Sequence, residues 1–106
     1  MIEIRKYVTE DGAVPIDEWL NSLKDRRAKA RILIRLDRVR LGMFGDHKPV
    51  GEGVHELRIS EGKGYRVYYG RVGKEVVLLL CGGNKPTQKK DIKRAQLFWQ
   101  RYSEGK

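Results

Sequence analysis

Apolar residues alternate with polar ones along the second half of the chain, a period that is typical of β-strands. The pattern predicts strands at Val54–Ile59, Gly64–Val72 and Glu75–Cys81. The last of these is almost uniformly apolar, which indicates an interior strand that is covered on both faces. A less regular alternation at Ile2–Val8 predicts one further strand near the start of the chain.

Three other segments carry apolar residues at the three- and four-residue spacing of an amphipathic helix. The first helix is expected to begin at Pro15, since proline suits the first helical position, and its stripe is Ile16, Trp19, Leu20 and Leu23. The second runs from a cap at Asp25 to Leu41, is stopped by Gly42, and buries Ala28, Ile32, Leu36 and Val39. The third begins near Pro86 or Thr87, with a stripe of Ile92, Ala95, Phe98, Trp99 and Tyr102.

The segment from Gly42 to Gly53 contains four glycines and one proline, which predicts a loop. The expected order is therefore β-α-α-β-β-β-α, in a single α+β domain that covers residues 1–106. We expect a mainly antiparallel sheet, with the two N-terminal helices packed on the face that carries His55.

The chain is strongly basic. Lys and Arg number 23 against 14 Asp and Glu, which gives a formal net charge of +9. Such an excess attracts polyanions and speeds encounter with them, so nucleic acid, an acidic protein or an anionic membrane surface would fit. The longest apolar run, Val76–Cys81, has six residues, far too few to span a membrane. Cys81 is the single cysteine, and no signal peptide is recognisable, so we expect a cytoplasmic protein without a membrane partner.

The second helix concentrates this charge. Most of its positions outside the apolar stripe are basic, namely Arg26, Arg27, Lys29, Arg31, Arg35, Arg38 and Arg40. These side chains could form a rail for nucleic acid, or a solvated face whose long stems shield the core.

The candidate site comes from the hairpin of the second and third predicted strands. Side chains alternate across a strand, so matching the apolar faces places Glu56, Arg58, Arg66 and Tyr68 together on the other face. Two adjacent guanidinium groups repel each other unless an anion lies between them. The pattern therefore predicts an anion-binding surface, and alanine in place of these arginines is expected to leave the fold intact.

A second element follows the last strand. The run Cys81-Gly-Gly-Asn-Lys-Pro-Thr87 leaves that strand and opens a helix, whose free N–H groups favour an anion. Lys85 and Lys89 add positive charge at this point. The two glycines are expected to provide the backbone freedom of a turn.

Taken together, the runs 56–59, 64–69, 79–85 and 88–95 resemble the RelE/ParE superfamily, most closely its HigB-like branch of addiction-module killer proteins. The resemblance implies a RelE-like fold and a type II toxin that cleaves mRNA, usually on the ribosome, until a cognate antitoxin masks it. The antitoxin is expected to be a small helix-turn-helix protein. By the same resemblance, Arg58, Arg66 and Lys85 fill the active-site positions.

RNA cleavage by the 2′-hydroxyl requires a base, an acid, and cations for the charge that develops on phosphorus, but no metal ion or other cofactor. Arg58 and Arg66 suit the last role, because guanidinium binds phosphate oxygens bidentately. Lys85 could act as the acid or as a charge clamp. Glu56 is a candidate base, or an ion-pair partner that aims Arg58.

The remaining candidates contact RNA or stay structural. Tyr68 is the one aromatic residue expected on the basic face, where it could stack on a base. His47 and Lys48 lie in the glycine-rich loop and could enter the site, with Lys89 beside it. His55 shares the apolar face and is expected to be structural. Two other functions stay open, a ParE-like inhibitor of DNA gyrase and a nucleic-acid-binding module without catalysis.

Overall fold

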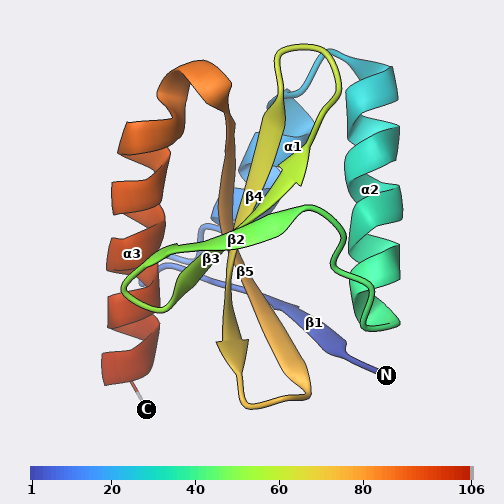
Figure 1. Cartoon of the computed structure of the whole chain (residues 1–106). Coiled ribbons are helices and arrows are strands. Elements are labelled where there is room, and N and C mark those ends of the chain that lie inside the picture. The colour runs from blue at the N-terminus through green and yellow to red at the C-terminus, as the bar shows by residue number, and fades with distance from the viewer. Residues whose placement is uncertain (106) are drawn as a thin grey trace.

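Five strands form one sheet in the order β1-β5-β4-β3-β2 (Figure 1). The computed structural model describes residues 1–105. The strands β3 (Val54–Ile59), β4 (Tyr65–Val72) and β5 (Val76–Asn84) are consecutive antiparallel neighbours. The N-terminal strand β1 (Glu3–Lys6) pairs in parallel with β5, which therefore lies inside the sheet. The predicted α+β class and the interior position of the apolar strand are confirmed.

The loop predicted for residues 42–53 is wrong in part, because it contains a fifth strand. This strand, β2 (His47–Gly51), pairs antiparallel with β3, so the order of elements is β-α-α-β-β-β-β-α. The glycine and proline content that predicted a loop is compatible with an edge strand. Pro49 is tolerated there because one side of the strand has no ladder to complete. Gly51 and Gly53, at φ of 95° and 83°, make the tight turn into β3.

The helices begin and end close to where the apolar spacing places them. They are α1 (Pro15–Ser22), α2 (Arg26–Arg40) and α3 (Gln88–Glu104), the last preceded by a 3-10 turn, η1 (Lys85–Thr87). The Asp25 carboxylate accepts a hydrogen bond from the Ala28 N–H at 3.0 Å and caps α2. Gly42, at φ of 81°, donates to the Val39 carbonyl at 2.9 Å and ends that helix as expected. Within residues 1–105, no helix combines the length and the apolar character needed to cross a membrane.

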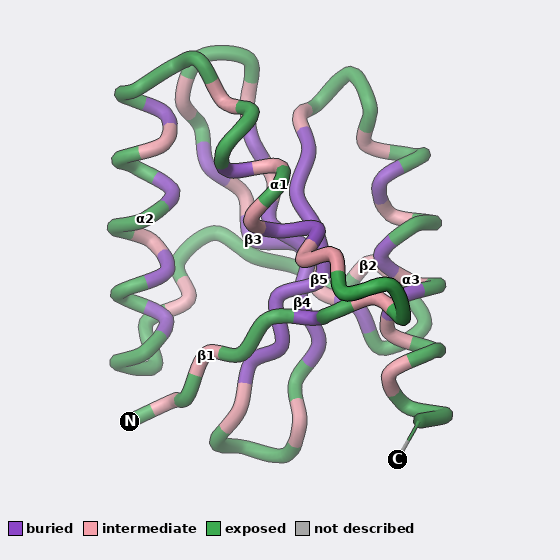
Figure 2. Tube along the Cα trace, turned by 180° about the vertical axis from the view of Figure 1, so that it is seen from behind, coloured by how far each residue is buried: buried purple, intermediate pink, exposed green. Residues whose placement is uncertain are grey.

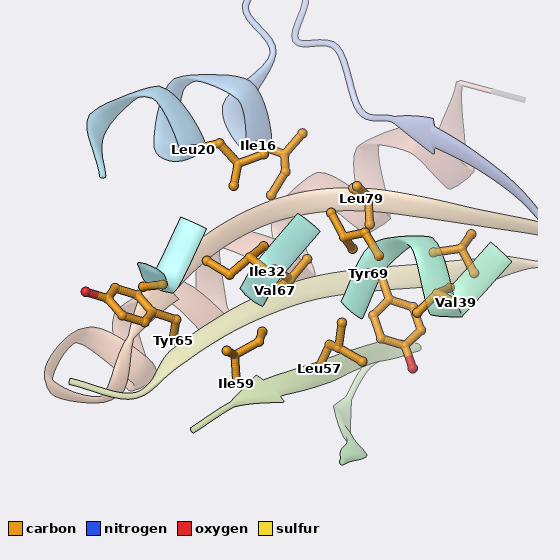
Figure 3. Close-up of a cluster of buried hydrophobic side chains, with 13 residues drawn as sticks. Ile16, Leu20, Ile32, Val39, Leu57, Ile59, Tyr65, Val67, Tyr69 and Leu79 are labelled. Carbon is orange, nitrogen blue, oxygen red and sulfur yellow. The ribbon is translucent and has the colours of Figure 1, made fainter. Parts of the chain in front are cut away.

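Both faces of the sheet are covered (Figures 1 and 2). The apolar stripes of α1 and α2 pack on one face against Leu57, Ile59, Tyr65, Val67 and Tyr69, as the close-up in Figure 3 shows. This is the face of His55, so the predicted position of the N-terminal helices is confirmed. On the other face α3 packs through Ala95 and Phe98 against a second cluster, which contains Val54, Tyr68, Leu78, Leu80 and Cys81.

The glycine pair near the end of β5 lies within the strand and provides clearance for its neighbours. A Cβ atom at Gly82 would overlap the indole ring of Trp19 on one face of the sheet. A Cβ atom at Gly83 would overlap the carboxylate of Asp91 on the other face. The expectation of a flexible turn at these residues was therefore wrong, because what requires glycine is the close approach of α1 and α3 to the same dipeptide.

We expect Gly82→Ala to lower the free energy of unfolding by about 1–3 kcal/mol, because the added methyl group forces the Trp19 ring out of its packed position. The measurement is the midpoint of chemical denaturation. Gly105→Ala serves as the control, because a Cβ atom there would meet its nearest neighbour at an ordinary contact distance of 3.5 Å. A Gly82→Ala midpoint equal to that of the control would contradict the packing role.

Candidate functional site

The predicted hairpin register is present. Arg58 lies opposite Arg66, and Glu56 lies opposite Tyr68, across the antiparallel pair of β3 and β4. All four side chains therefore leave the sheet on the face that α3 covers. Their environments along that face differ, because α3 covers Glu56 and Tyr68 fully and leaves the two arginines partly open.

An open groove of about 510 Å³ lies where the β3–β4 hairpin meets the start of η1. It is lined by Asp46, Arg58, Ser60, Gly62, Lys63, Gly64, Arg66 and Lys85. Three of the four residues predicted to be catalytic thus share one site. The turn that precedes α3 is tied to the hairpin by its backbone, since the Lys85 N–H donates to the Gly64 carbonyl at 3.0 Å.

Arg58 is held by a residue that the sequence did not single out. Its Nε and Nη2 atoms donate to Oδ1 of Asp46 at 3.1 and 2.8 Å, and its backbone N–H donates to the Asp46 carbonyl at 2.9 Å. Arg35 supports both residues from α2, donating to the carbonyls of Arg58 at 2.6 Å and Asp46 at 3.1 Å. Asp46 was missed because it lies in the segment read as a loop. Arg35 was counted among the surface charges, whereas it points inward to this junction.

Glu56 does not reach the groove, so its assignment as a general base is wrong. Its side chain is fully buried beneath α3. One carboxylate oxygen, Oε2, accepts a hydrogen bond from Nε2 of Gln88 at 2.8 Å and lies 3.8 Å from Nε of Arg66. Glu56 is therefore the charge partner of Arg66, rather than of Arg58 as the alternative reading expected. Its negative charge lies next to the Nε end of the Arg66 guanidinium, while the Arg66 side chain lines the groove.

Tyr68 cannot stack on a nucleobase, which corrects the prediction made for it. Its side chain is completely buried in the cluster beneath α3. Burial raises the pKa of its hydroxyl, and the neighbouring Glu56 carboxylate raises the pKa further, so the group stays protonated. Alternation along β4 correctly gave the face of Tyr68 but not the helix that covers it. No aromatic side chain lines the groove among the described residues.

The other predicted RNA contacts lie outside the groove. His47 on β2 is opposite Leu57 and so belongs to the α1/α2 face, where its Nδ1 atom is 2.8 Å from the Gly45 carbonyl. Lys48 is opposite Glu56 at the sheet edge, and Lys89 lies in the first turn of α3, both exposed to solvent.

His55 has the structural environment that was expected of it. Its ring stacks on Tyr69 with the centroids 5.3 Å apart, on the face covered by the N-terminal helices. Burial lowers the pKa of His55, and the charges of His47 and Arg71 lower it further. A histidine in this position is a packing residue, remote from the groove.

The helix terminus is closed by the protein's own oxygen atoms, which corrects the expectation of a free anion site there. The Thr87 N–H is capped by Oδ1 of Asn84 at 3.3 Å. The Thr87 hydroxyl in turn donates to the Asp91 carboxylate, which is buried in the first turn of α3. The positive charge of this region therefore comes from the Lys85 side chain rather than from free backbone N–H groups.

The groove as a whole offers four cationic side chains, Arg58, Lys63, Arg66 and Lys85, against the single carboxylate of Asp46. Ser60 adds one hydroxyl. Hydrogen bonds to Asp46 orient the Arg58 guanidinium, and the buried Glu56 carboxylate, 3.8 Å from Nε of Arg66, attracts the other guanidinium without a hydrogen bond. Guanidinium and ammonium groups that converge in this way have the charge and the hydrogen-bond donors that a phosphate group requires.

Comparison with known proteins gives two findings. Residues 18–103 match the family model described as phage-derived protein Gp49-like (DUF891). An uncharacterised protein of Haemophilus influenzae is 55% identical over 84 residues, which are 79% of this chain and 85% of that protein. The residues matched by the family model include every residue that lines the groove.

Truncation of the two arginines is expected to affect stability unequally. Arg66→Ala removes the charge partner of a fully buried carboxylate and should lower the free energy of unfolding by about 3 kcal/mol. Arg58→Ala should lower it by less than about 1 kcal/mol, because its partner Asp46 is half exposed. From these contacts we expect alanine to be tolerated at Arg58 and to weaken the fold at Arg66, in place of the equal tolerance expected from the sequence.

The measurement is chemical denaturation of each variant, repeated in a Glu56→Gln background. In that background Arg66→Ala should have little effect, because no buried charge is left without a partner. An equal loss of stability in both backgrounds would show that Glu56 and Arg66 are not coupled.

Proposed function

Because the chain belongs to the phage-derived Gp49-like family, a toxin-like family associated with addiction modules, we propose that it is a type II toxin that cleaves mRNA. The observation that carries this proposal is the groove, where Arg58, Arg66 and Lys85 lie together, with a carboxylate paired to each of the two guanidinium groups. The proposal includes the resemblance to the HigB-like branch of the RelE/ParE superfamily. The partner that neutralises the protein is a cognate antitoxin.

The proposed reaction is transesterification within RNA. The 2′-oxygen attacks the adjacent phosphorus, the bond from phosphorus to the 5′-oxygen breaks, and the products are a cyclic phosphate and a free 5′-hydroxyl. Arg58 and Arg66 bind the non-bridging oxygens, whose charge increases in the transition state. This step needs a group that accepts the 2′-hydroxyl proton and one that supplies a proton to the leaving 5′-oxygen.

The groove supplies one candidate for each proton transfer. Asp46 is the carboxylate that lines it, and takes the role of base that Glu56 cannot fill from its buried position. Lys85 is the last residue in the chain that lines the groove, and its side chain is exposed. In this proposal its ammonium group donates a proton to the leaving 5′-oxygen. In this mechanism Asp46 takes up the proton of the 2′-hydroxyl and Lys85 supplies the proton of the new 5′-hydroxyl, so the step uses no metal ion. Cleavage of mRNA places the action in the cytoplasm, at or near the ribosome, and stops translation.

We expect Lys85→Ala and Arg58→Ala each to reduce the rate of mRNA cleavage on the order of 100-fold, because each removes one contact that stabilises the transition state. Both side chains are at least partly exposed, so the variants should stay folded. Arg66→Ala is a poor test, since loss of stability would also abolish activity. Arg66→Lys, which keeps a positive charge and loses bidentate binding, replaces it.

The measurement is growth after induction at equal protein level, together with mapping of mRNA ends. Lys90→Ala is the matched control, because Lys90 is an exposed lysine of α3 that does not line the groove. Wild-type cleavage by folded Lys85→Ala and Arg58→Ala proteins would refute the assigned site. Growth arrest with intact mRNA and blocked gyrase would instead establish the gyrase-inhibitor function.

A further inference from the structure

The outer face of α2 exposes apolar side chains in a way that the rest of the surface does not. Seven large hydrophobic residues are exposed within residues 1–105, and four of them fall in the short segment 33–43. They are Leu33 and Ile34 at 45%, Leu41 at 62% and Met43 at 51% exposure. Single exposed hydrophobic residues are ordinary on a protein surface, but a cluster of them indicates a contact site.

Two members of this cluster, Ile34 in α2 and Leu41 at its C-cap, lie on one side of the helix. The buried stripe of α2 is Ala28, Ile32, Leu36 and Val39. Ala30, Ile34 and Leu41 lie at the four- and seven-residue intervals that form a second stripe, on the side of the helix opposite to the first. Figure 2 shows that this side of α2 is open along its length, with no other element of the chain against it. This outer side therefore exposes a few apolar side chains around one carboxylate, that of Asp37, which is neutralised by Arg40 at 3.6 Å.

Charge surrounds the second stripe. α2 contains seven basic residues and one acidic residue, Asp37. Arg27 and Arg31 lie 4.0 and 3.8 Å from Glu61, whereas Arg26 and Arg38 have no acidic side chain within ion-pair distance in the described part of the chain. A second copy of the chain is a poor occupant, because a twofold contact would bring the arginines of both helices together. A bare nucleic-acid rail would not explain the exposed leucine and isoleucine side chains.

We propose that the outer face of α2 binds an acidic amphipathic segment of a protein partner, whose apolar residues cover Ile34 and Leu41 while its carboxylates pair with the free arginines. The identification of this partner as the antitoxin rests on the proposed function. The surface is distinct from the groove but next to it. The N-terminal end of α2 contacts Glu61 in the hairpin turn that borders the groove, and Arg35 of the same helix holds Arg58 and Asp46.

The test uses the full chain and a labelled synthetic peptide with leucine at the i, i+3, i+4 and i+7 positions and glutamate elsewhere. Binding is followed by fluorescence anisotropy. We expect Ile34→Gln to weaken binding about tenfold, which corresponds to the loss of one apolar contact. Leu97→Gln on α3 is the matched control, because Leu97 is 43% exposed and lies outside this face, and it should bind as the wild type does.

Three results with the peptide would overturn the proposal, and one with RNA would do so as well. They are no binding of the peptide, equal weakening by Ile34→Gln and Leu97→Gln, and undiminished binding of a peptide whose leucines are replaced by glutamine, which would leave charge alone. Displacement of the peptide by an oligouridylate whose own affinity falls with Ile34→Gln would assign the face to RNA, and so would also overturn it.

The same measurements distinguish a failure of the proposed nuclease function from a failure of the docking surface. Lys85→Ala should lose mRNA cleavage and keep the affinity of the wild type for the peptide, since Lys85 is not on α2. A wild-type protein that binds the peptide through Ile34 and leaves mRNA intact would refute the nuclease while this docking surface stood. A protein that cleaves mRNA and ignores the peptide would refute only the docking surface.

Discussion

The buried ion pair of Glu56 and Arg66 constrains much of the molecule. A carboxylate that is wholly removed from water requires a positive partner, and Nε of Arg66 lies 3.8 Å from Oε2 of Glu56. This requirement fixes the guanidinium at the edge of the groove and links β3 to β4. The hydrogen bond from Gln88 extends the link to α3, so the helix that covers this face also helps to orient the charge beside it. Stability and the geometry of the site thus depend on the same contact.

The sequence predicted most of what depends on periodicity. The buried stripe of α2, the cap at Asp25, the stop at Gly42 and the pairing of Arg58 with Arg66 all follow from local spacing, and the structure has each of them. Spacing of this kind specifies which residues share a face. It carries no information about which other element comes to cover that face.

The errors have this common origin. Glu56 and Tyr68 were assigned to the groove because they share a face with the two arginines, but α3 covers one end of that face and leaves the other open. Asp46 contacts Arg58, a residue 12 positions away, because β2 pairs with β3. The glycines and the proline around β2 predict a loop, so the sequence contains no indication of this contact. The glycines at 82 and 83 were read as a turn, since nothing local shows that Trp19 and Asp91 approach them from opposite sides.

The groove can form only late in synthesis of the chain, because its residues come from distant parts of the sequence. Its lining runs from Asp46 to Lys85, and the Gln88 side chain completes the support behind Arg66. The N-terminal strand likewise waits for β5, since Glu3 pairs with Val76. A nascent chain therefore has neither a complete sheet nor an assembled cationic site until its last helix has begun to emerge from the ribosome. During its own translation the protein therefore lacks the surface that we propose acts on mRNA, although α2 has by then been synthesised.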